Sequence, residues 1–426
     1  MQIEQLYKIY SAHPSVQTDT RKLKKDDLFF ALKGPSFNGN LFAQQAVEAG
    51  AAFAITDEVI NFESDKIIKV DDVLDTLQQL AKYHRQQFNI PFIAITGSNG
   101  KTTTKELIHE VLSTTYKTYT TTGNLNNHIG VPLTVLKVRA DAAMAVVEMG
   151  ANHQKEIESY CRYTLPTHGL ITNCGKAHLE GFGGVEGVRK GKGELFDYLR
   201  DHNGTAFIME DYAYLKEMSK GIKNIFTYGT TAASAITGTA VNSSGFLTVA
   251  IKKGAAISTI ATQLVGDYNL PNILAAVALG KYFNVADEKI KAALENYTPS
   301  NSRSQLIEKD GNKIILDAYN ANPTSMKAAI ENFAKMDGDK KILLLGGMME
   351  LGEESVAEHQ SIINIIDQYK WYAVVLVGGD YHKINHPYLN FKNSQEAKEW
   401  FKLGKFTHAQ VLVKGSRSMQ MERVLE

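Results

Sequence analysis

The chain has very little cysteine: its 426 residues include only 2, Cys161 and Cys174. Two cysteines cannot build the disulfide framework of a small secreted scaffold, and a reducing compartment is the simplest expectation. No apolar run approaches the ~20 residues that a membrane helix needs. The opening residues, Met-Gln-Ile-Glu-Gln-Leu-Tyr-Lys, lack the apolar core of a signal peptide. We therefore expect a cytoplasmic protein without membrane insertion.

An excess of charge of either sign is also missing. Lys and Arg total 46, as do Asp and Glu, so the formal net charge is zero. No global field would recruit nucleic acid or an anionic membrane, and any anion binding must be local. Hydrophobic content of 44% and charged content of 22% are those of an ordinary globular protein. The length of the chain predicts about two to three domains.

The clearest local pattern is an apolar strand, Phe92 to Ile95, followed by a turn with glycine at 97 and 100 and a helix that begins at Lys101. Glycine allows a tight turn, and a helix N-terminus attracts anions. Strand, turn and helix are the context that a phosphate loop requires. One glycine of the full motif is missing, because Ile95 occupies the position five residues before Gly100.

This stretch predicts a cradle for the phosphates of a nucleotide. We expect the backbone amides and Lys101 to hold the phosphates, and the hydroxyl of Thr102 to hold Mg²⁺. The alternative is a glycine-rich turn without a ligand. The residues expected in the cradle are Gly97, Ser98, Asn99, Gly100, Lys101, Thr102 and Thr103.

Strands that alternate with helices predict an α/β fold of three domains. The expected domains are a small N-terminal α/β domain at residues 1–90, a central parallel-sheet domain with the phosphate loop at 91–298, and a C-terminal Rossmann-like α/β domain at 299–426. Short alternation at 236–265 predicts an antiparallel appendage to the central sheet. In the first domain, Asn40 is placed to cap a helix that runs to Glu48.

Ligands of parallel sheets bind at the carboxyl ends of the strands. Glu148 ends an apolar strand, where a carboxylate can hold a metal ion or lie in solvent. His178 follows another strand and is either a ligand or a satisfied core imidazole. In the C-terminal domain, glycine-rich segments at 346–352, 378–380 and 414–417 follow three strands, and together they predict one binding face.

The helix expected at residues 187–199 contains Gly191 and Gly193, each of which costs about 1 kcal/mol of helix stability. Glycine at these positions indicates that a large group approaches the backbone. Lys190 and Lys192 are therefore candidates for function, although two lysines on a helix often form only a solvated face.

Several segments together resemble the Mur ligase family. Its phosphate loop has the variant pattern Thr-Gly-x-Asn-Gly-Lys-Thr, which accounts for the missing glycine. The resemblance covers nearly the whole chain, and the loop Asp-Ala-Tyr-Asn-Ala-Asn-Pro that begins at Asp317 is similar to that of members that use D-alanyl-D-alanine. The matching segments are Thr96 to Lys105, Gly123 to Pro132, Glu148 to Asn152, Ile171 to Phe182 and Asp317 to Ser325.

The resemblance implies an ATP-dependent amide ligation in peptidoglycan precursor synthesis. The implied partners are UDP-N-acetylmuramoyl-tripeptide and D-alanyl-D-alanine, with ATP and two Mg²⁺ ions as cofactors. A carboxylate of the first substrate would become an acyl phosphate, which the amine of the second would attack. A monomer that binds no nucleic acid is expected.

The resemblance also implies roles for individual residues. Thr102 and Glu148 would hold one Mg²⁺ ion, while His178 would serve the second. Lys192 falls where relatives carry a carbamylated lysine, and the neighbouring Lys190 leaves that assignment open. Arg303 would reach the γ-phosphate after closure about a hinge at 297–303.

Other implied contacts concern the nucleotides and the sugar-peptide. Asn269 would contact the nucleotide, and Asp317 would contact the ATP ribose or orient the hinge. Asn126 and Asn127 would face the sugar-peptide. The uridine nucleotide would be gripped by Thr20, Arg21, Lys33 and Gly34.

Two alternatives share the phosphate loop. One is a Mur or folylpolyglutamate-type ligase with a different amino-acid substrate, which should lack the loop that begins at Asp317. The other is a nucleotide switch that performs no ligation.

Overall fold

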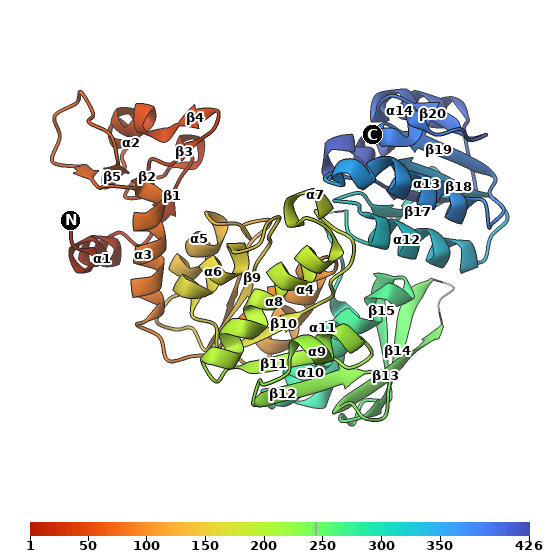
Figure 1. Cartoon of the computed structure of the whole chain (residues 1–426), viewed down its shortest axis with the longest axis horizontal. Helices are drawn as coiled ribbons and strands as arrows, with labels where there is room; N and C mark the ends of the chain where they lie inside the picture. Colours follow the sequence, from red (N-terminus) through yellow and green to blue (C-terminus); the bar gives the residue numbers. More distant parts are fainter. Residues whose placement is uncertain (243–244, 301) are drawn as a thin grey trace. The chain divides into compact units, whose positions relative to one another are not determined.

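The computed structural model describes residues 1–242, 245–300 and 302–426 of the chain (Figure 1). Strands and helices alternate along the sequence, and three main sheets are present. The α/β class expected from the sequence is confirmed. The chain groups into two compact units, one of residues 1–94, 116–150 and 156–169, and one of 95–115, 151–155 and 170–426. These units are not the three domains expected above, whose boundaries stay predictions.

The N-terminal sheet has four parallel strands in the order β1-β2-β5-β6. Its core includes Phe29, Ala31, Ala46 and Ala54, which are all buried. The strands are β1 (Val16–Gln17), β2 (Leu28–Phe30), β5 (Phe53–Thr56) and β6 (Ile67–Lys69). Around them lie α1 (Ile3–Ala12), η1 (Thr20–Lys22), η2 (Gly39–Phe42), α2 (Ala43–Glu48), α3 (Val73–Arg85) and a small hairpin, β3 (Lys33–Gly34) with β4 (Phe37–Asn38).

The predicted cap at Asn40 is wrong. Asn40 lies inside η2, and α2 begins only at Ala43, without a side-chain cap. Asn38 caps η2 instead, since its Oδ1 accepts from the backbone N–H of Asn40 at 3.0 Å. The amide of Asn40 is buried because it bonds to Asp57, with Nδ2 donating to Oδ1 at 2.7 Å. Asn40 therefore bonds to Asp57, which is distant in the sequence, and does not cap α2.

The central sheet has nine strands in the order β15-β14-β13-β12-β11-β10-β7-β9-β8. Its described β8–β9, β11–β12 and β12–β13 pairs are parallel. The strands are β7 (Phe92–Thr96), β8 (Thr118–Thr120), β9 (Met144–Glu148), β10 (His168–Ile171), β11 (Thr205–Met209) and β12 (Asn224–Gly229). The helices between them are α4 (Lys101–Ser113), α5 (Gly130–Leu136), α6 (Glu156–Thr164), α7 (Leu179–Phe182), α8 (Val185–Asp201) and α9 (Ala213–Met218).

The appendage predicted at 236–265 is confirmed. β13 (Ile236–Asn242), β14 (Phe246–Lys253) and β15 (Thr259–Val265) pair antiparallel and lie side by side in green in Figure 1. After a short turn, η3 (Asp267–Asn269), come α10 (Leu270–Tyr282) and α11 (Asp287–Asn296). α10 packs against α4, the helix that follows the phosphate loop.

The C-terminal sheet has six strands in the order β16-β17-β21-β18-β19-β20, and all its pairs except β16–β17 are parallel. Its core includes Ile314, Ile342, Val375 and Val411. The strands are β16 (Gln305–Lys309), β17 (Asn312–Asp317), β18 (Lys341–Gly346), β19 (Ala373–Val377), β20 (Leu389–Phe391) and β21 (Gln410–Lys414). The helices are α12 (Pro323–Lys335), η4 (Gly352–Glu354), α13 (Ser355–Ile366), η5 (Gly379–Lys383), α14 (Ser394–Leu403), η6 (Arg417–Met419) and η7 (Met421–Leu425).

The three glycine-rich strand ends of this sheet meet one another. A Cβ on Gly347 would lie 2.4 Å from the Cα of Gly379, and one on Gly415 would lie 3.0 Å from the Cα of Gly346. Glycine is needed there because backbones approach backbones. Their predicted use as a binding face stays a prediction.

Among the described residues, none of the helices combines the length and the apolar character that crossing a lipid bilayer would take.

Candidate active site

The phosphate-loop turn lies between β7 and α4, as the sequence predicts. Gly97 has φ of 142°, and a Cβ there would lie 2.0 Å from Thr172 Oγ1. Gly100 has φ of 80°, and its Cβ would lie 2.7 Å from Asn272 Oδ1. Both positions therefore require glycine for backbone conformation and for space. Gly100 is also the N-cap of α4, so the helix has no side-chain cap at its anion-attracting end.

The ammonium of Lys101 lies against the same turn. Its Nζ donates to the carbonyl oxygens of Gly97 at 2.7 Å and Ser98 at 3.1 Å. Thr102 is buried and Thr103 is half-buried. The cation and the hydroxyl expected in the cradle thus lie at the turn, while their contacts with a nucleotide stay predictions.

The loop after β10 holds the phosphate loop in shape. The backbone N–H of Ser98 donates to Asn173 O at 2.8 Å, and that of Asn99 donates to Asn173 Oδ1 at 3.1 Å. The carbonyl of Asn99 accepts from Thr172 Oγ1 at 2.6 Å and from Asn173 Nδ2 at 3.0 Å. Thr172 and Asn173 were not among the site residues that the sequence indicated. Their signals were a position at the carboxyl end of a strand and a place in the matching segment Ile171 to Phe182.

A chain of buried amides supports the other side of α4. Thr104 Oγ1 donates to Asn272 Oδ1 at 3.0 Å, Asn272 Nδ2 donates to Asn269 Oδ1 at 2.9 Å, and Asn269 Nδ2 donates to Val265 O at 2.9 Å. Asn269 is 3% exposed, and both the Nδ2 and the Oδ1 of its side chain form hydrogen bonds within the protein. Its predicted contact with a nucleotide stays untested, while Asn272, which the sequence analysis missed, connects it to the phosphate-loop helix.

The loop that begins at Asp317 lies beside the phosphate loop within the second compact unit. Asn322 Nδ2 donates to Asn99 Oδ1 at 2.7 Å. Asn322 also caps α12 in a reciprocal capping box with Ser325, which fixes the orientation of its side chain. Close by, the backbone N–H of Lys176 donates to Thr324 Oγ1 at 2.9 Å. The loop that is similar to that of family members that use D-alanyl-D-alanine therefore packs against the phosphate loop.

His178 lies at the start of α7 with φ of 53°. Its Nδ1 is 2.5 Å from Oε2 of Glu350, in the loop after β18. The hydrogen bond from His178 holds the pKa of the Glu350 carboxyl below its ordinary value. An ion pair lies close to this contact in the sequence, since Lys176 Nζ is 2.5 Å from Oε1 of the buried Glu358 on α13. The sequence indicated His178 but neither acidic partner.

The two lysines of α8 have different environments. Lys192 is 1% exposed, whereas Lys190 is exposed. The ammonium of Lys192 donates to Ala151 O at 2.8 Å and lies 4.8 Å from the centre of the Phe182 ring. A Cβ on Gly191 would lie 2.4 Å from that ring, so the large group expected near this glycine is Phe182. Burial favours Lys192 over Lys190 as the functional lysine.

Arg303 stacks on an aromatic ring of the same loop that begins at Asp317. Its guanidinium carbon lies 3.7 Å from the centre of the Tyr319 ring, and its Nε is buried with no hydrogen-bond partner among the described residues. Asp317 Oδ1 accepts from the backbone N–H of Ser304 at 3.2 Å, and Oδ2 accepts from the buried Lys414 at 2.5 Å. Asp317 thus contacts the segment beside Arg303, and its role at the hinge or the ribose stays a prediction.

In the first compact unit, Glu148 ends β9 and is 1% exposed. Asn126 Nδ2 donates to Glu148 Oε1 at 2.7 Å, which orients the carboxylate. Asn127 Oδ1 accepts from the backbone N–H of Ile129 at 3.2 Å and of Gly130 at 2.9 Å. Asn127 therefore shapes its own turn, and contact of either asparagine with the sugar-peptide stays a prediction.

The residues expected to grip uridine lie in two places on the N-terminal domain. Thr20 and Arg21 lie in η1, where the Arg21 guanidinium donates to Asp19 through Nε and Nη2 at 2.9 Å each. These hydrogen bonds lower the pKa of Asp19 to about 2. Arg21 is exposed and already has an anionic partner.

Lys33 and Gly34 form β3 of the small hairpin. Lys33 Nζ lies 3.1 Å from Asp57 Oδ1 and 3.5 Å from Glu58 Oε1. A Cβ on Gly34 would lie 2.4 Å from the ring of Phe37, which is 53% exposed. The hairpin therefore presents a cation and an accessible ring, and its role in binding a nucleotide stays a prediction.

Among the described residues, no group of three or more His, Cys, Asp or Glu side chains is gathered to hold a metal ion. Mg²⁺ rarely uses such a cage, because it binds through one or two carboxylates together with water and phosphate oxygens. Hydroxyl and carboxylate oxygens such as those of Thr102 and Glu148 are the donor types that it prefers. The donor set thus fits magnesium held jointly with a nucleotide.

These features define a class of protein: an ATP-dependent ligase in which a second α/β domain lies against a phosphate loop. The Mur ligase middle domain matches residues 95–280, the Mur ligase glutamate ligase domain matches 302–417, and the Mur ligase family catalytic domain matches 14–85. The chain belongs to the Mur ligase family.

Individual relatives narrow the comparison. The chain is 36% identical over 424 residues to UDP-N-acetylmuramoyl-tripeptide--D-alanyl-D-alanine ligase of Bacillus subtilis, covering 96% of this chain and 92% of the relative. A crystal structure of MurF from Acinetobacter baumannii superposes with a TM-score of 0.88 at 31% identity, covering 96% and 92% of the two chains. MurF ligase from Thermotoga maritima, solved in complex with ADP, gives a TM-score of 0.87 at 26% identity, covering 96% of each.

Proposed function

We propose that this protein joins D-alanyl-D-alanine to UDP-N-acetylmuramoyl-tripeptide at the expense of ATP, in peptidoglycan precursor synthesis. The observation that carries the proposal is similarity along nearly the whole chain to ligases of that name. The Asp317 loop against the phosphate cradle supports it, since a ligase must bring its second domain to the nucleotide. A switch that performs no ligation has no need of such a contact.

The chemistry proceeds in two steps. A carboxylate oxygen of the tripeptide attacks the γ-phosphorus of ATP, the bond to the bridging oxygen breaks, and ADP leaves. The amine of D-alanyl-D-alanine then attacks the acyl phosphate carbon and loses a proton, and inorganic phosphate leaves with the C–O bond pair. The first step brings two anions together, so the site must supply positive charge and hydrogen-bond donors.

Lys101 and the amides from Gly97 to Thr103 provide that charge and those donors in the proposal. Lys101 already lies against the loop, so little rearrangement is needed for its ammonium to face phosphate oxygens. Thr172 and Asn173 position the loop through hydrogen bonds to Asn99. Arg303 is the cation proposed to reach the γ-phosphate, and Tyr319 is a positioning residue for its guanidinium.

Two Mg²⁺ ions belong to the proposal. Thr102 and Glu148 would hold the first, and β7 and β9, which lead to these residues, are neighbours in the order of the central sheet. His178 and Lys192 would serve the second. Bound magnesium neutralises phosphate oxygens and stabilises the charge that develops on them.

Lys192 requires a covalent change to serve a metal ion. An ammonium carries no lone pair, whereas a neutral amine that adds CO₂ becomes a carbamate with carboxylate-like oxygens. Lys192 is 1% exposed, and the amine that adds CO₂ in the proposal is the neutral form. The carbamate, the cytoplasmic location and the monomeric state are parts of the proposal.

The experiment is a substrate panel scored by ADP release and by product mass. We expect ADP release to require both the tripeptide nucleotide and D-alanyl-D-alanine, with a product that contains both. Lys101→Ala should abolish release, while Lys220→Ala, on a lysine that is 72% exposed, should not. ATP hydrolysis that needs neither substrate would reject the ligase in favour of a switch. If the enzyme preferred another amino acid as its second substrate, the assignment of D-alanyl-D-alanine would be rejected, while the ligase activity would stand.

A further inference from the structure

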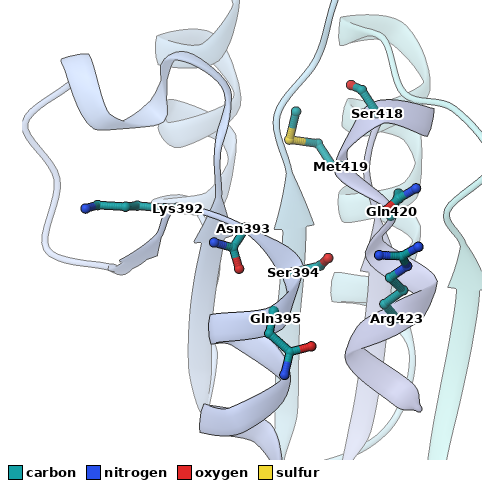
Figure 2. Close-up of a pocket in the computed structure, with 8 residues that line it drawn as sticks. All are labelled: Lys392, Asn393, Ser394, Gln395, Ser418, Met419, Gln420 and Arg423. Carbon is teal, nitrogen blue, oxygen red and sulfur yellow. The ribbon is translucent and has the colours of Figure 1, made fainter.

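A cavity of about 310 Å³ lies at the surface of the C-terminal sheet, outside the site described above. Two segments line it (Figure 2): residues 392–395, where β20 leads into α14, and residues 418–420 together with Arg423, where η6 leads into η7. The cavity is at the small end of the range for ligand sites, which suits a compact ligand. No Asp or Glu is among its lining residues.

Ser394 is one of the polar residues that line this space. It is the first residue of α14 and is 7% exposed, yet its hydroxyl has no hydrogen-bond partner in the part of the chain that the structure describes. Figure 2 shows its oxygen directed from α14 across the cavity toward Gln420. The oxygen is not among the enclosed side-chain atoms that lack a partner, so it is open to the cavity, from which water or a ligand can bond to it.

The N-terminus of α14 adds two backbone donors. Asn393 Oδ1 accepts from Glu396 N at 3.0 Å, and Ala397 N reaches Asn393 O at 3.4 Å. The N–H groups of Ser394 and Gln395 have no acceptor among the described residues, as expected in a first helical turn. With the helix dipole, they favour a negative ligand.

The two cationic side chains that line the cavity, Arg423 and Lys392, point in different directions. Arg423 has no ion-pair partner among the described residues, and Figure 2 shows its guanidinium beside Gln420, on the wall opposite Ser394. The chain of Lys392 extends away from Arg423 in that view. The carboxylate of Glu396, which follows the lining residues in α14, would repel a bound anion. Its two oxygens already accept hydrogen bonds, from Lys392 N at 2.9 Å and from Asn393 Nδ2 at 3.3 Å.

We propose that this cavity binds a small oxyanion, a phosphate or a carboxylate group, through Arg423, the Ser394 hydroxyl and the first two N–H groups of α14. All of these groups donate, and guanidinium pairs well with either oxyanion. The two sources that share this chemistry are inorganic phosphate and the terminal carboxylate of a short peptide. The proposal does not depend on the ligase reaction.

The test is calorimetric titration of the full chain with phosphate, with D-alanyl-D-alanine, and with the C-terminal amide of that dipeptide. The Lys101→Ala protein serves as the background, so that the phosphate loop contributes less. Arg423→Gln should weaken binding about tenfold, and Ser394→Ala severalfold. Lys392→Gln is the matched control, since it removes the same charge from a side chain that points away, and it should change affinity less than about twofold.

Binding of phosphate alone would identify phosphate as the ligand. If D-alanyl-D-alanine binds and its C-terminal amide does not, the terminal carboxylate of the peptide is the group that is bound. The proposal is overturned if Arg423→Gln and Lys392→Gln have equal effects, since binding would then reflect net charge. It is also overturned if none of the three probes binds in the millimolar range. Melting temperatures of the variants confirm that each is folded.

Discussion

Replacing Gly97 by alanine tests the geometry of the phosphate cradle. A Cβ there would lie 2.0 Å from Thr172 Oγ1 and 3.0 Å from Thr172 N. The hydroxyl cannot rotate away without losing its 2.6 Å hydrogen bond to Asn99 O. The backbone at φ of 142° also disfavours a side chain. Backbone strain of about 1–3 kcal/mol and overpacking of about 1–3 kcal/mol predict a loss of about 2–6 kcal/mol.

Two other glycines are matched controls. Gly123 has φ of 59° with nothing within 4 Å of its Cβ position, so alanine there should cost only the backbone term, about 1 kcal/mol. Gly100→Ala should lie between the two, because the group it meets is the side chain of Asn272. The measurements are urea unfolding and ATP-dependent phosphate release. Equal stability losses for Gly97→Ala and Gly123→Ala, with turnover preserved, would refute the reasoning.

Three further predictions follow from single contacts. Lys192→Ala should lose activity and recover part of it with a small added carboxylic acid, whereas Lys190→Ala should remain active; an active Lys192→Ala protein would remove that residue from the site. Burial lowers the pKa of His168 from 6.5 to about 4, so the unfolded chain binds more protons in that window. The free energy of unfolding should fall by up to about 3 kcal/mol as pH drops through it, and urea titrations of His168→Gln should show a shallower fall. Tyr319→Leu should lower kcat/KM about 2- to 30-fold by releasing the Arg303 guanidinium, while Tyr319→Phe keeps the ring and should retain the rate; equal rates for both would contradict the stacking role.

Local patterns were sufficient where the chain interacts with itself over short distances. The strand from Phe92, the turn and the helix from Lys101 were predicted, because burial, glycine and helix initiation are all encoded within about a dozen neighbouring residues. The hairpin of β16 and β17 also has a local cause, since Asp310 and Gly311 form its turn.

Long-range partners were not visible in those patterns. Asn40 was read as a helix cap, but Asp57, 17 residues away, takes its amide. Asn99 bonds to Asn322 at a separation of 223 residues, and no local feature of either residue indicates the other. Glu350 was in a segment that the sequence indicated, yet its pairing with His178 required the fold.

The sequence by itself determined the class of each domain, the phosphate-loop turn and the family resemblance, because these depend on spacing along the chain. Only the tertiary structure decided which of two lysines is buried, which loop clamps the phosphate cradle and which ring supports Arg303. The physical reason is that burial and hydrogen bonding depend on neighbours in space. Those neighbours come from segments that the sequence separates by up to hundreds of residues.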